Sequence, residues 1–208
     1  PPVCVFPGEK EVAEFQASFV IGIEEIDGVE IELQAEAMAA YLAARREAQA
    51  QGLSITPRDG AEGARRSFAD TLRLWNSRFL PATDFWLARG RLTAAEVEKL
   101  KTLPVREQVR EVLNLEKRGI FFNSSFTASI IYSVAPPGAS QHLSMLALDV
   151  NEYRSKKARD ILARHGWFRT VKTDAPHFTF LGRKKEELKS LGLKKFVSES
   201  GEYWIPNI

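Results

Sequence analysis

The stretch Leu146-Ala147-Leu148-Asp149-Val150 combines four apolar residues with one aspartate. Such a short and nearly continuous apolar run predicts a buried strand. Two further stretches, 167–171 and 177–181, predict strands that pair with each other, and a helix over about 154–164 precedes them and stops at Gly166. Together these segments predict a small antiparallel sheet in the last third of the chain.

The first third of the chain predicts a hairpin followed by a helix. Asp27-Gly28 lies between 19–25 and 29–33, and an Asp-Gly pair between two such runs is a strong hairpin signal. From about 33 to 51 the apolar residues recur at helical spacing, and Gly52 follows where a helix C-terminal cap belongs.

The middle of the chain, about 77–118, is expected to be all-helical, with a capping box at 93–96. Short strands are predicted at 53–57 and within 120–134, and Gly201 predicts a closing hairpin. Short strands between helices, without regular βαβ units, indicate an α+β fold. We therefore expect one domain, 1–208, with a small antiparallel sheet flanked by helices and a helical insertion at about 77–118. Four aromatic side chains are expected in a core rather than on a binding surface: Trp75, Phe79, Phe85 and Trp86.

Composition excludes several classes of protein. The 208 residues include 29 basic and 27 acidic side chains, a net charge of +2, and no block of lysine and arginine that is typical of a nucleic-acid binder. The only cysteine, Cys4, permits neither an internal disulfide nor a cysteine-rich zinc site. No apolar run approaches the length of a membrane span. A metal site would have to use the three histidines and the carboxylates.

Two of the three histidines, His142 and His177, lie in unusual settings near acidic residues. An aspartate in a buried strand, such as Asp149, is costly unless its charge is paired or binds a metal. His142, Asp149 and His177 form a plausible three-ligand set, and two imidazoles with one carboxylate suit zinc. Asp174, three residues before His177, is a candidate general base. The alternative is two ordinary strand histidines, and we expect His165 at a helix end, outside the site.

The spacing Ser140-x-His142-x6-Asp149, followed by Asp174-x-x-His177, resembles the zinc peptidases of bacterial cell walls. That family holds VanY-like D-alanyl-D-alanine carboxypeptidases and the L-alanyl-D-glutamate endopeptidases of phage endolysins. An upstream pair, Arg66-Ser67, also resembles a family motif, and the resemblance covers roughly 33–75 and 120–182.

The resemblance implies a zinc-dependent peptidase with His142, Asp149 and His177 as metal ligands. Asp174 would take a proton from the attacking water and pass it to the leaving amine. Arg66, with Arg65 as its nearest competitor, would hold the oxyanion or a substrate carboxylate. The remaining motif residue, Ser140, would support the ligand shell or contact substrate.

The expected substrate is a peptidoglycan stem peptide, cut as a D-alanyl-D-alanine carboxypeptidase would cut it. Asp174 stands where the carboxypeptidase branch has Glu, so L-alanyl-D-glutamate endopeptidase activity is the alternative. Met145, where the family usually has Gly, favours a third reading, a non-catalytic zinc-stabilised binding module of Hedgehog type. Because peptidoglycan lies outside the cytoplasmic membrane, we expect an extracytoplasmic location, with any signal peptide absent from these 208 residues.

Overall fold

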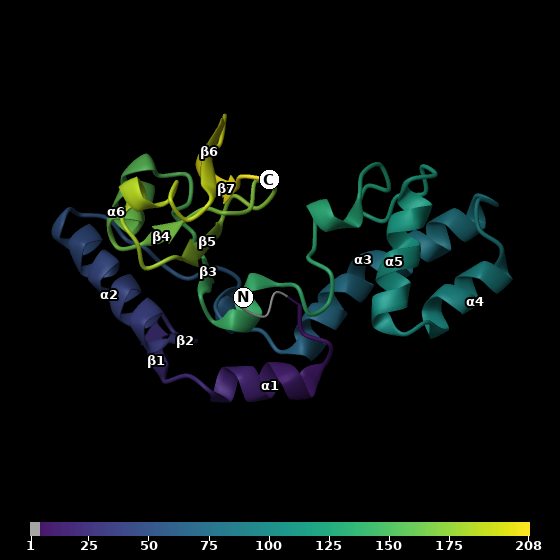
Figure 1. Cartoon of the computed structure of the whole chain (residues 1–208), viewed down its shortest axis with the longest axis horizontal. Helices are drawn as coiled ribbons and strands as arrows, with labels where there is room; N and C mark the ends of the chain where they lie inside the picture. Colours follow the sequence, from purple (N-terminus) through teal and green to yellow (C-terminus); the bar gives the residue numbers. More distant parts are fainter. Residues whose placement is uncertain (1–4) are drawn as a thin grey trace. The chain divides into compact units, whose positions relative to one another are not determined.

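The computed structural model describes residues 5–208 and divides into two compact units (Figure 1). The helical unit runs up to Val12 and from Ser67 to Ser140, and the sheet unit comprises 13–66 and 141–208. The first boundary falls within helix α1 (Glu9–Ala17). Cys4 lies outside the described residues. Within 5–208, no helix combines the length and the apolar character needed to cross a membrane.

The sheet unit begins with the predicted hairpin. Strands β1 (Ile21–Ile26) and β2 (Val29–Gln34) pair antiparallel, with Ile26 opposite Val29 across the turn. Asp27 and Gly28 have φ values of 53° and 79°. Positive φ at both central residues is the geometry of a two-residue type I′ turn, which explains why Asp-Gly stands there.

Helix α2 (Ala35–Ala50) follows the hairpin directly. Four of the apolar residues that recur at helical spacing in the sequence are buried in this helix: Ala37, Tyr41, Ala44 and Ala48. Gly52, with a φ of 69°, follows the helix in the left-handed conformation that the sequence predicted. The predicted strand at 53–57 is wrong, because only Pro57 forms a single antiparallel bridge, to Val150.

The central sheet has the strand order β3-β5-β4 and is antiparallel throughout. Its strands are β3 (Ala147–Asp149), β4 (Trp167–Phe168) and β5 (His177–Phe180). Helix α6 (Lys156–Arg164) begins after the N-cap Ser155 and packs with α2. Leu148, Ile161 and Trp167 join the residues of α2 in one core. The α+β class is confirmed, with helices beside a small antiparallel sheet.

A second hairpin ends the chain. Strands β6 (Leu193–Ser198) and β7 (Gly201–Pro206) pair antiparallel, as Gly201 predicted. A short 3-10 helix, η4 (Lys185–Glu187), precedes β6. The hairpin joins the central sheet region through a small apolar cluster of Phe168, Leu188 and Trp204.

The helical unit is built from α3 (Phe68–Ala88), α4 (Ala94–Thr102) and α5 (Val105–Glu116). Capping boxes at Ser67 and Thr93 begin the first two helices, the second as predicted. The expected helical stretch, 77–118, therefore lies in this unit. Its core contains Trp75, Phe79 and Trp86, as expected. Phe85, the fourth expected aromatic residue, is partly buried against this core.

The strands predicted within 120–134 are wrong, since this segment is a loop with one 3-10 turn, η2 (Ile130–Tyr132). The buried carboxylate of Glu116 accepts hydrogen bonds from the backbone N–H of Phe122 at 3.2 Å and of Ile130 at 2.7 Å, and from the hydroxyl of Ser129. A side chain therefore satisfies the donors that a strand partner would otherwise take.

We expect Glu116→Ala to destabilise the protein by about 3 kcal/mol, because it leaves two buried backbone N–H groups without acceptors. The change is measured as the free energy of unfolding in urea, followed by tryptophan fluorescence. Glu111, exposed on the same helix, supplies the control, and Glu111→Ala should lie within about 0.5 kcal/mol of the wild type. Equal stabilities of the two variants would contradict the role given to Glu116.

Candidate metal centre

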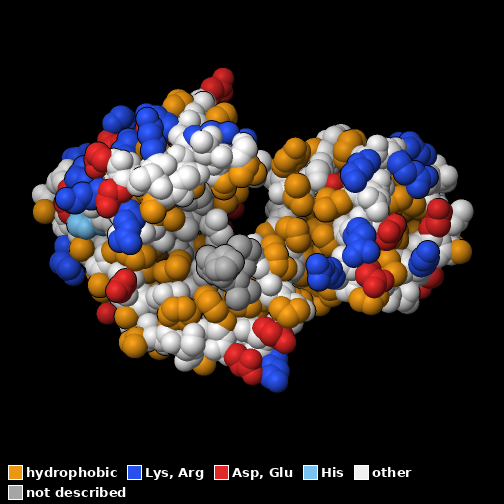
Figure 2. All heavy atoms as spheres, viewed as in Figure 1, with side chains coloured by type: hydrophobic (Ala, Val, Ile, Leu, Met, Phe, Trp, Pro, Cys, Tyr) orange, Lys and Arg blue, Asp and Glu red, His pale blue; other side chains and the backbone are white. Residues whose placement is uncertain are grey.

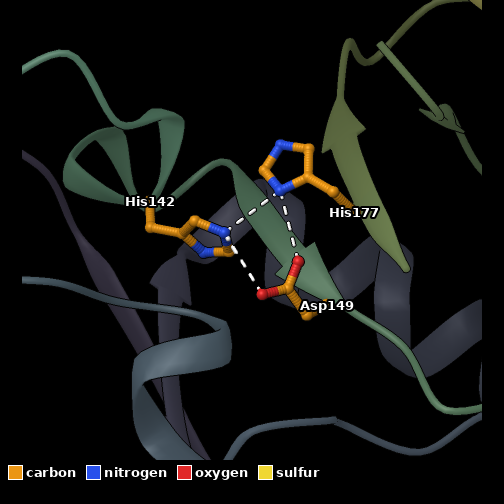
Figure 3. Close-up of side chains that lie close together, drawn as sticks. All are labelled: His142, Asp149 and His177. Atoms are coloured by element: carbon orange, nitrogen blue, oxygen red, sulfur yellow. Dashed lines mark hydrogen bonds and ion pairs between the residues drawn. The ribbon is translucent and has the colours of Figure 1, made fainter. Parts of the chain in front are cut away.

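Three side chains from two strands and one turn converge within the sheet unit (Figure 3). His142 belongs to the 3-10 helix η3 (Gln141–Ser144), Asp149 ends β3, and His177 begins β5. The β3–β5 register places Asp149 directly opposite His177. All three side chains are buried, with exposed fractions of 2% to 4%. The structure thus brings together the three residues that the sequence proposed as ligands.

The distances between the polar atoms of these three side chains fit a metal ion. His177 Nδ1 lies 3.1 Å from His142 Nε2 and 3.2 Å from Asp149 Oδ1, and His142 Nε2 lies 3.4 Å from Asp149 Oδ2. A tetrahedral zinc with bonds of about 2.0–2.1 Å separates its ligand atoms by about 3.3–3.4 Å. These separations, in which each nitrogen approaches a different oxygen of Asp149, are close to those between the ligands of such a zinc, and the nitrogen and oxygen donor set suits zinc.

A hydrogen bond at Nε2 of His177 determines that Nδ1 is the ring nitrogen free to bind a metal. Nε2 lies 2.8 Å from Oε1 of Gln141, an oxygen that also accepts hydrogen bonds from the hydroxyls of Thr170 and Thr179. Because a carbonyl oxygen has no hydrogen, the proton in the contact with His177 is on Nε2, and the neutral ring presents its lone pair at Nδ1. His142 Nδ1, in contrast, is buried without a hydrogen-bond partner among residues 5–208.

Met145 shapes the turn between the first histidine and the strand that follows. It is fully buried and has a φ of 56°, its N–H donates to the carbonyl of His142 at 3.2 Å, and its own carbonyl accepts from the N–H of Gln34 at 3.1 Å. The left-handed conformation accounts for glycine in the resembled pattern, since glycine adopts it without strain. Here a methionine adopts it, at a cost of about 1–3 kcal/mol that its surroundings must offset.

Burial and charge set the protonation states of the ligands. Burial lowers the pKa of His142 to about 4, although the neighbouring Asp149 acts in the opposite direction. Burial alone would raise the pKa of Asp149, but the adjacent imidazoles of His142 and His177 hold that pKa well below its ordinary value. The group therefore offers a neutral imidazole and an ionised carboxylate, the forms that bind a metal.

Asp174 lies beside this group on the turn that leads into β5. Its carbonyl accepts a hydrogen bond from the N–H of His177 at 3.3 Å, and its side chain is exposed. Partial desolvation and the charge of Asp149 raise the pKa of Asp174 above its ordinary value, while His177 and Arg66 act against the increase. Its carboxylate is thus more basic than that of an ordinary aspartate and is electrostatically connected to the ligand group.

The two candidate arginines have different surroundings. Nη2 of Arg66 lies 3.4 Å from Oδ2 of Asp149, and its Nε donates to the carbonyl of Glu62 at 2.9 Å. Arg65 instead pairs with Glu32 and donates from Nε to Oε1 of Gln16 at 2.9 Å. Arg66 is therefore the arginine whose side chain is beside the ligand group.

Sequence reasoning missed Gln16, a buried residue on α1. Its Nε2 donates to the backbone carbonyls of Arg66 at 2.9 Å and Leu143 at 3.1 Å, so it joins the arginine segment to the turn that carries His142. A glutamine that acts through contacts 50 and 127 residues away leaves no local signal. Gln141, although adjacent to His142, was also missed.

The other two residues considered from sequence have simple positions. Ser140 is the last residue of the helical unit, and its side chain is nearly buried. His165 follows α6 as its C-cap and lies 2.8 Å from a carboxylate oxygen of Glu47. His165 is outside the ligand group, as expected.

Comparisons with known proteins give weak similarities. No protein-family model and no curated protein matches the chain. A structure of the vancomycin-resistance D,D-pentapeptidase VanY in complex with Zn(II) is 16% identical, with a TM-score of 0.44 over 80% of this chain and 82% of that one. The LdcB LD-carboxypeptidase, described in relation to peptidoglycan recognition, is 14% identical, with a TM-score of 0.42 over 80% and 86% of the two chains.

Without metal, acidification should destabilise the protein. The pKa of His142 is about 4 when folded and 6.5 ordinarily, so the unfolded chain binds more protons between these values and stability falls as the pH falls. We expect chelator-treated protein to lose about 3 kcal/mol of its free energy of unfolding from pH 7 to pH 4. Urea titrations at several pH values measure it. Constant stability from pH 7 to pH 5 would refute the burial of a neutral His142.

Gln141→Ala should weaken zinc binding about 10–100-fold, because His177 loses the acceptor that fixes its tautomer and ring orientation. Competition with a fluorescent chelator measures the affinity directly. Gln141→Glu keeps an acceptor oxygen and is expected to remain within about threefold of the wild type. If Gln141→Ala binds zinc as tightly as the wild type, the glutamine does not orient the ligand.

Proposed function

We propose that this chain is a zinc-dependent peptidase that hydrolyses peptidoglycan stem peptides. One observation carries the proposal: His142, Asp149 and His177 bring two imidazole nitrogens and a carboxylate together in a buried setting, with contacts of 3.1–3.4 Å between neighbouring side chains. The same residues form the motifs that resemble the cell-wall zinc peptidases. A structural role for the metal would need a fourth protein ligand, and among residues 5–208 the group has three.

Asp174 is the proposed general base. Zinc held by these three residues would supply a Lewis acid for the peptide carbonyl and would make water a better nucleophile. Its side chain is exposed, and its backbone carbonyl accepts a hydrogen bond from the N–H of His177, so a carboxylate lies on the segment that leads into the ligand group. A carboxylate oxygen of Asp174 accepts the proton of the attacking water and then delivers it to the nitrogen of the leaving amine.

Arg66 is the proposed site for negative charge. Its guanidinium is permanently charged and lies 3.4 Å from the carboxylate of Asp149, which supports a role beside the ligand group. There it binds the developing oxyanion or the terminal carboxylate of the substrate. From its place in the motif, two residues before His142, Ser140 is proposed to support the site or to contact substrate.

D-alanyl-D-alanine carboxypeptidase activity is the specific reaction that we propose, since a substrate that ends in a carboxylate gives Arg66 a partner. The residue at 174 favours a second candidate, because an aspartate there is typical of the endopeptidase branch that cuts L-alanyl-D-glutamate. A non-catalytic module would need no base beside its metal. Either peptidase would act where peptidoglycan lies, outside the cytoplasmic membrane.

The test is digestion of defined muropeptides by the zinc-loaded protein, with the products identified by mass spectrometry. We expect a pentapeptide stem to lose one alanine. Separation of the stem after L-alanine would instead identify the endopeptidase. If neither bond is cut while about one zinc per chain is bound, the peptidase proposal is wrong and a binding module remains.

Asp174→Ala should lower kcat/KM for the cleaved muropeptide by about 10²–10⁴-fold and leave about one zinc per chain. Asp174→Glu should recover most of the activity, because it retains a carboxylate. Asp84→Ala, an exposed substitution in the helical unit, controls for loss of charge. Undiminished hydrolysis by Asp174→Ala would refute its role as the base.

A further inference from the structure

A cavity of about 350 Å³ lies within the sheet unit, away from the ligand group. It is lined by α6, β4 and the β6–β7 hairpin, and by Phe178 from β5. Successive residues of a strand point to opposite faces, so Phe178 faces away from the side on which His177 meets Asp149. The cavity and the ligand group are therefore separate sites on the two faces of β5.

Two arginines converge at this cavity without carboxylate partners. Arg169 is 3% exposed and donates to the backbone carbonyls of Ser200 and Glu202, both at 2.9 Å, and to the hydroxyl of Tyr203 at 3.3 Å. Arg159 donates to two backbone carbonyls at 2.8 Å. Within residues 5–208, neither guanidinium has a carboxylate oxygen within ion-pair distance.

Gly201 shows how close the two guanidinium groups come. A Cβ atom added there would lie 2.6 Å from Nη2 of Arg169 and 3.1 Å from Nη2 of Arg159. Two like charges that approach the same point repel each other, and burial and Arg159 together lower the pKa of Arg169. An anion between them would remove this repulsion.

The acidic side chains of the cavity already have partners. Asp160 pairs with Lys156 at 2.6 Å, and Glu202 pairs with Lys185 at 2.7 Å and with Lys195. Four cationic side chains line the cavity against these two carboxylates, so its lining carries a net charge of +2. In Figure 2, lysine and arginine side chains gather over the part of the sheet unit that holds α6.

Two buried N–H donors of the lining also lack acceptors. Nε of Arg169 and Nε1 of Trp167 have no hydrogen-bond partner among the described residues. Buried donors in native proteins are nearly always paired with protein, water or ligand. The unpaired charge of the two guanidinium groups indicates the partner that suits the cavity, an acceptor that carries negative charge.

We propose that this cavity binds an oxyanion group, a phosphate or a carboxylate, between Arg159 and Arg169. The forked donors of a guanidinium match the oxygens of either group. Trp167, Phe178 and Trp204 also line the cavity and are 5% exposed or less, so the ligand meets mainly the polar side chains. This site is independent of the metal centre and of the proposed peptidase activity.

The four tryptophans provide an internal control for the test. Trp167 and Trp204 line the cavity, whereas Trp75 and Trp86 belong to the core of the helical unit. Inorganic phosphate, and separately sodium acetate, are titrated into the ¹⁵N-labelled full-length protein at constant ionic strength. We expect saturable shifts of the indole N–H signals of Trp167 and Trp204 with at least one anion, and none for the other two.

Arg159→Gln should weaken the apparent affinity for that anion about tenfold or more, since it removes a charged donor. Arg164→Gln is the matched control, because it removes the same charge from the same helix but does not line the cavity. The stronger anion identifies the ligand as a phosphate or a carboxylate. Absence of saturable shifts with both anions, equal shifts of all four indoles, or equal affinities of the two variants would overturn the proposal. Asp174→Ala, inactive as a peptidase, should still bind the anion.

Discussion

The metal centre depends on one backbone constraint, the register that sets Asp149 opposite His177 across two antiparallel strands. Opposed residues project to the same face with Cβ atoms about 5 Å apart, so a carboxylate and an imidazole from distant segments can share a metal. A slip of one residue would replace His177 by Phe178 and reverse every side chain of the strand. The N–H of Val150, which donates to the carbonyl of Pro176 at 3.0 Å, extends this pairing beyond the strand ends.

The same strand separates two environments of opposite electrostatic character. On one face, a buried carboxylate is surrounded by imidazoles and Arg66. On the other, the cavity beside Phe178 is lined by an excess of cationic side chains. A polar or charged group buried without its partner is costly, so each face needs its own compensation. In a sheet of three short strands, the ligand group and the cavity share one layer of backbone.

Local signals allowed much of the fold to be predicted. The Asp27-Gly28 turn and the capping box at Thr93 depend on neighbouring residues, and both were predicted correctly. The segment 120–134 was not, because the backbone donors there pair with Glu116, which no local pattern reveals. Within the site, motif spacing identified the ligand set, since its residue types and order carry the chemistry. The supporting glutamines act across 35 residues or more, and only the fold brings their partners near.

The division into units also bears on how this chain tolerates change in length. The first segment of the sheet unit ends at Arg66 and the second begins at Gln141. Residues 67–140, which connect them, belong to the helical unit. The N–H of Arg66 donates to the carbonyl of His142 at 3.3 Å. This hydrogen bond holds the two ends of the 67–140 insertion together beside the metal centre. Closing a loop costs only about 0.6 kcal/mol more each time its length doubles. The length of the 67–140 insertion can therefore change in evolution at a small cost in free energy. The Arg66–His142 contact and the metal centre beside it keep their geometry.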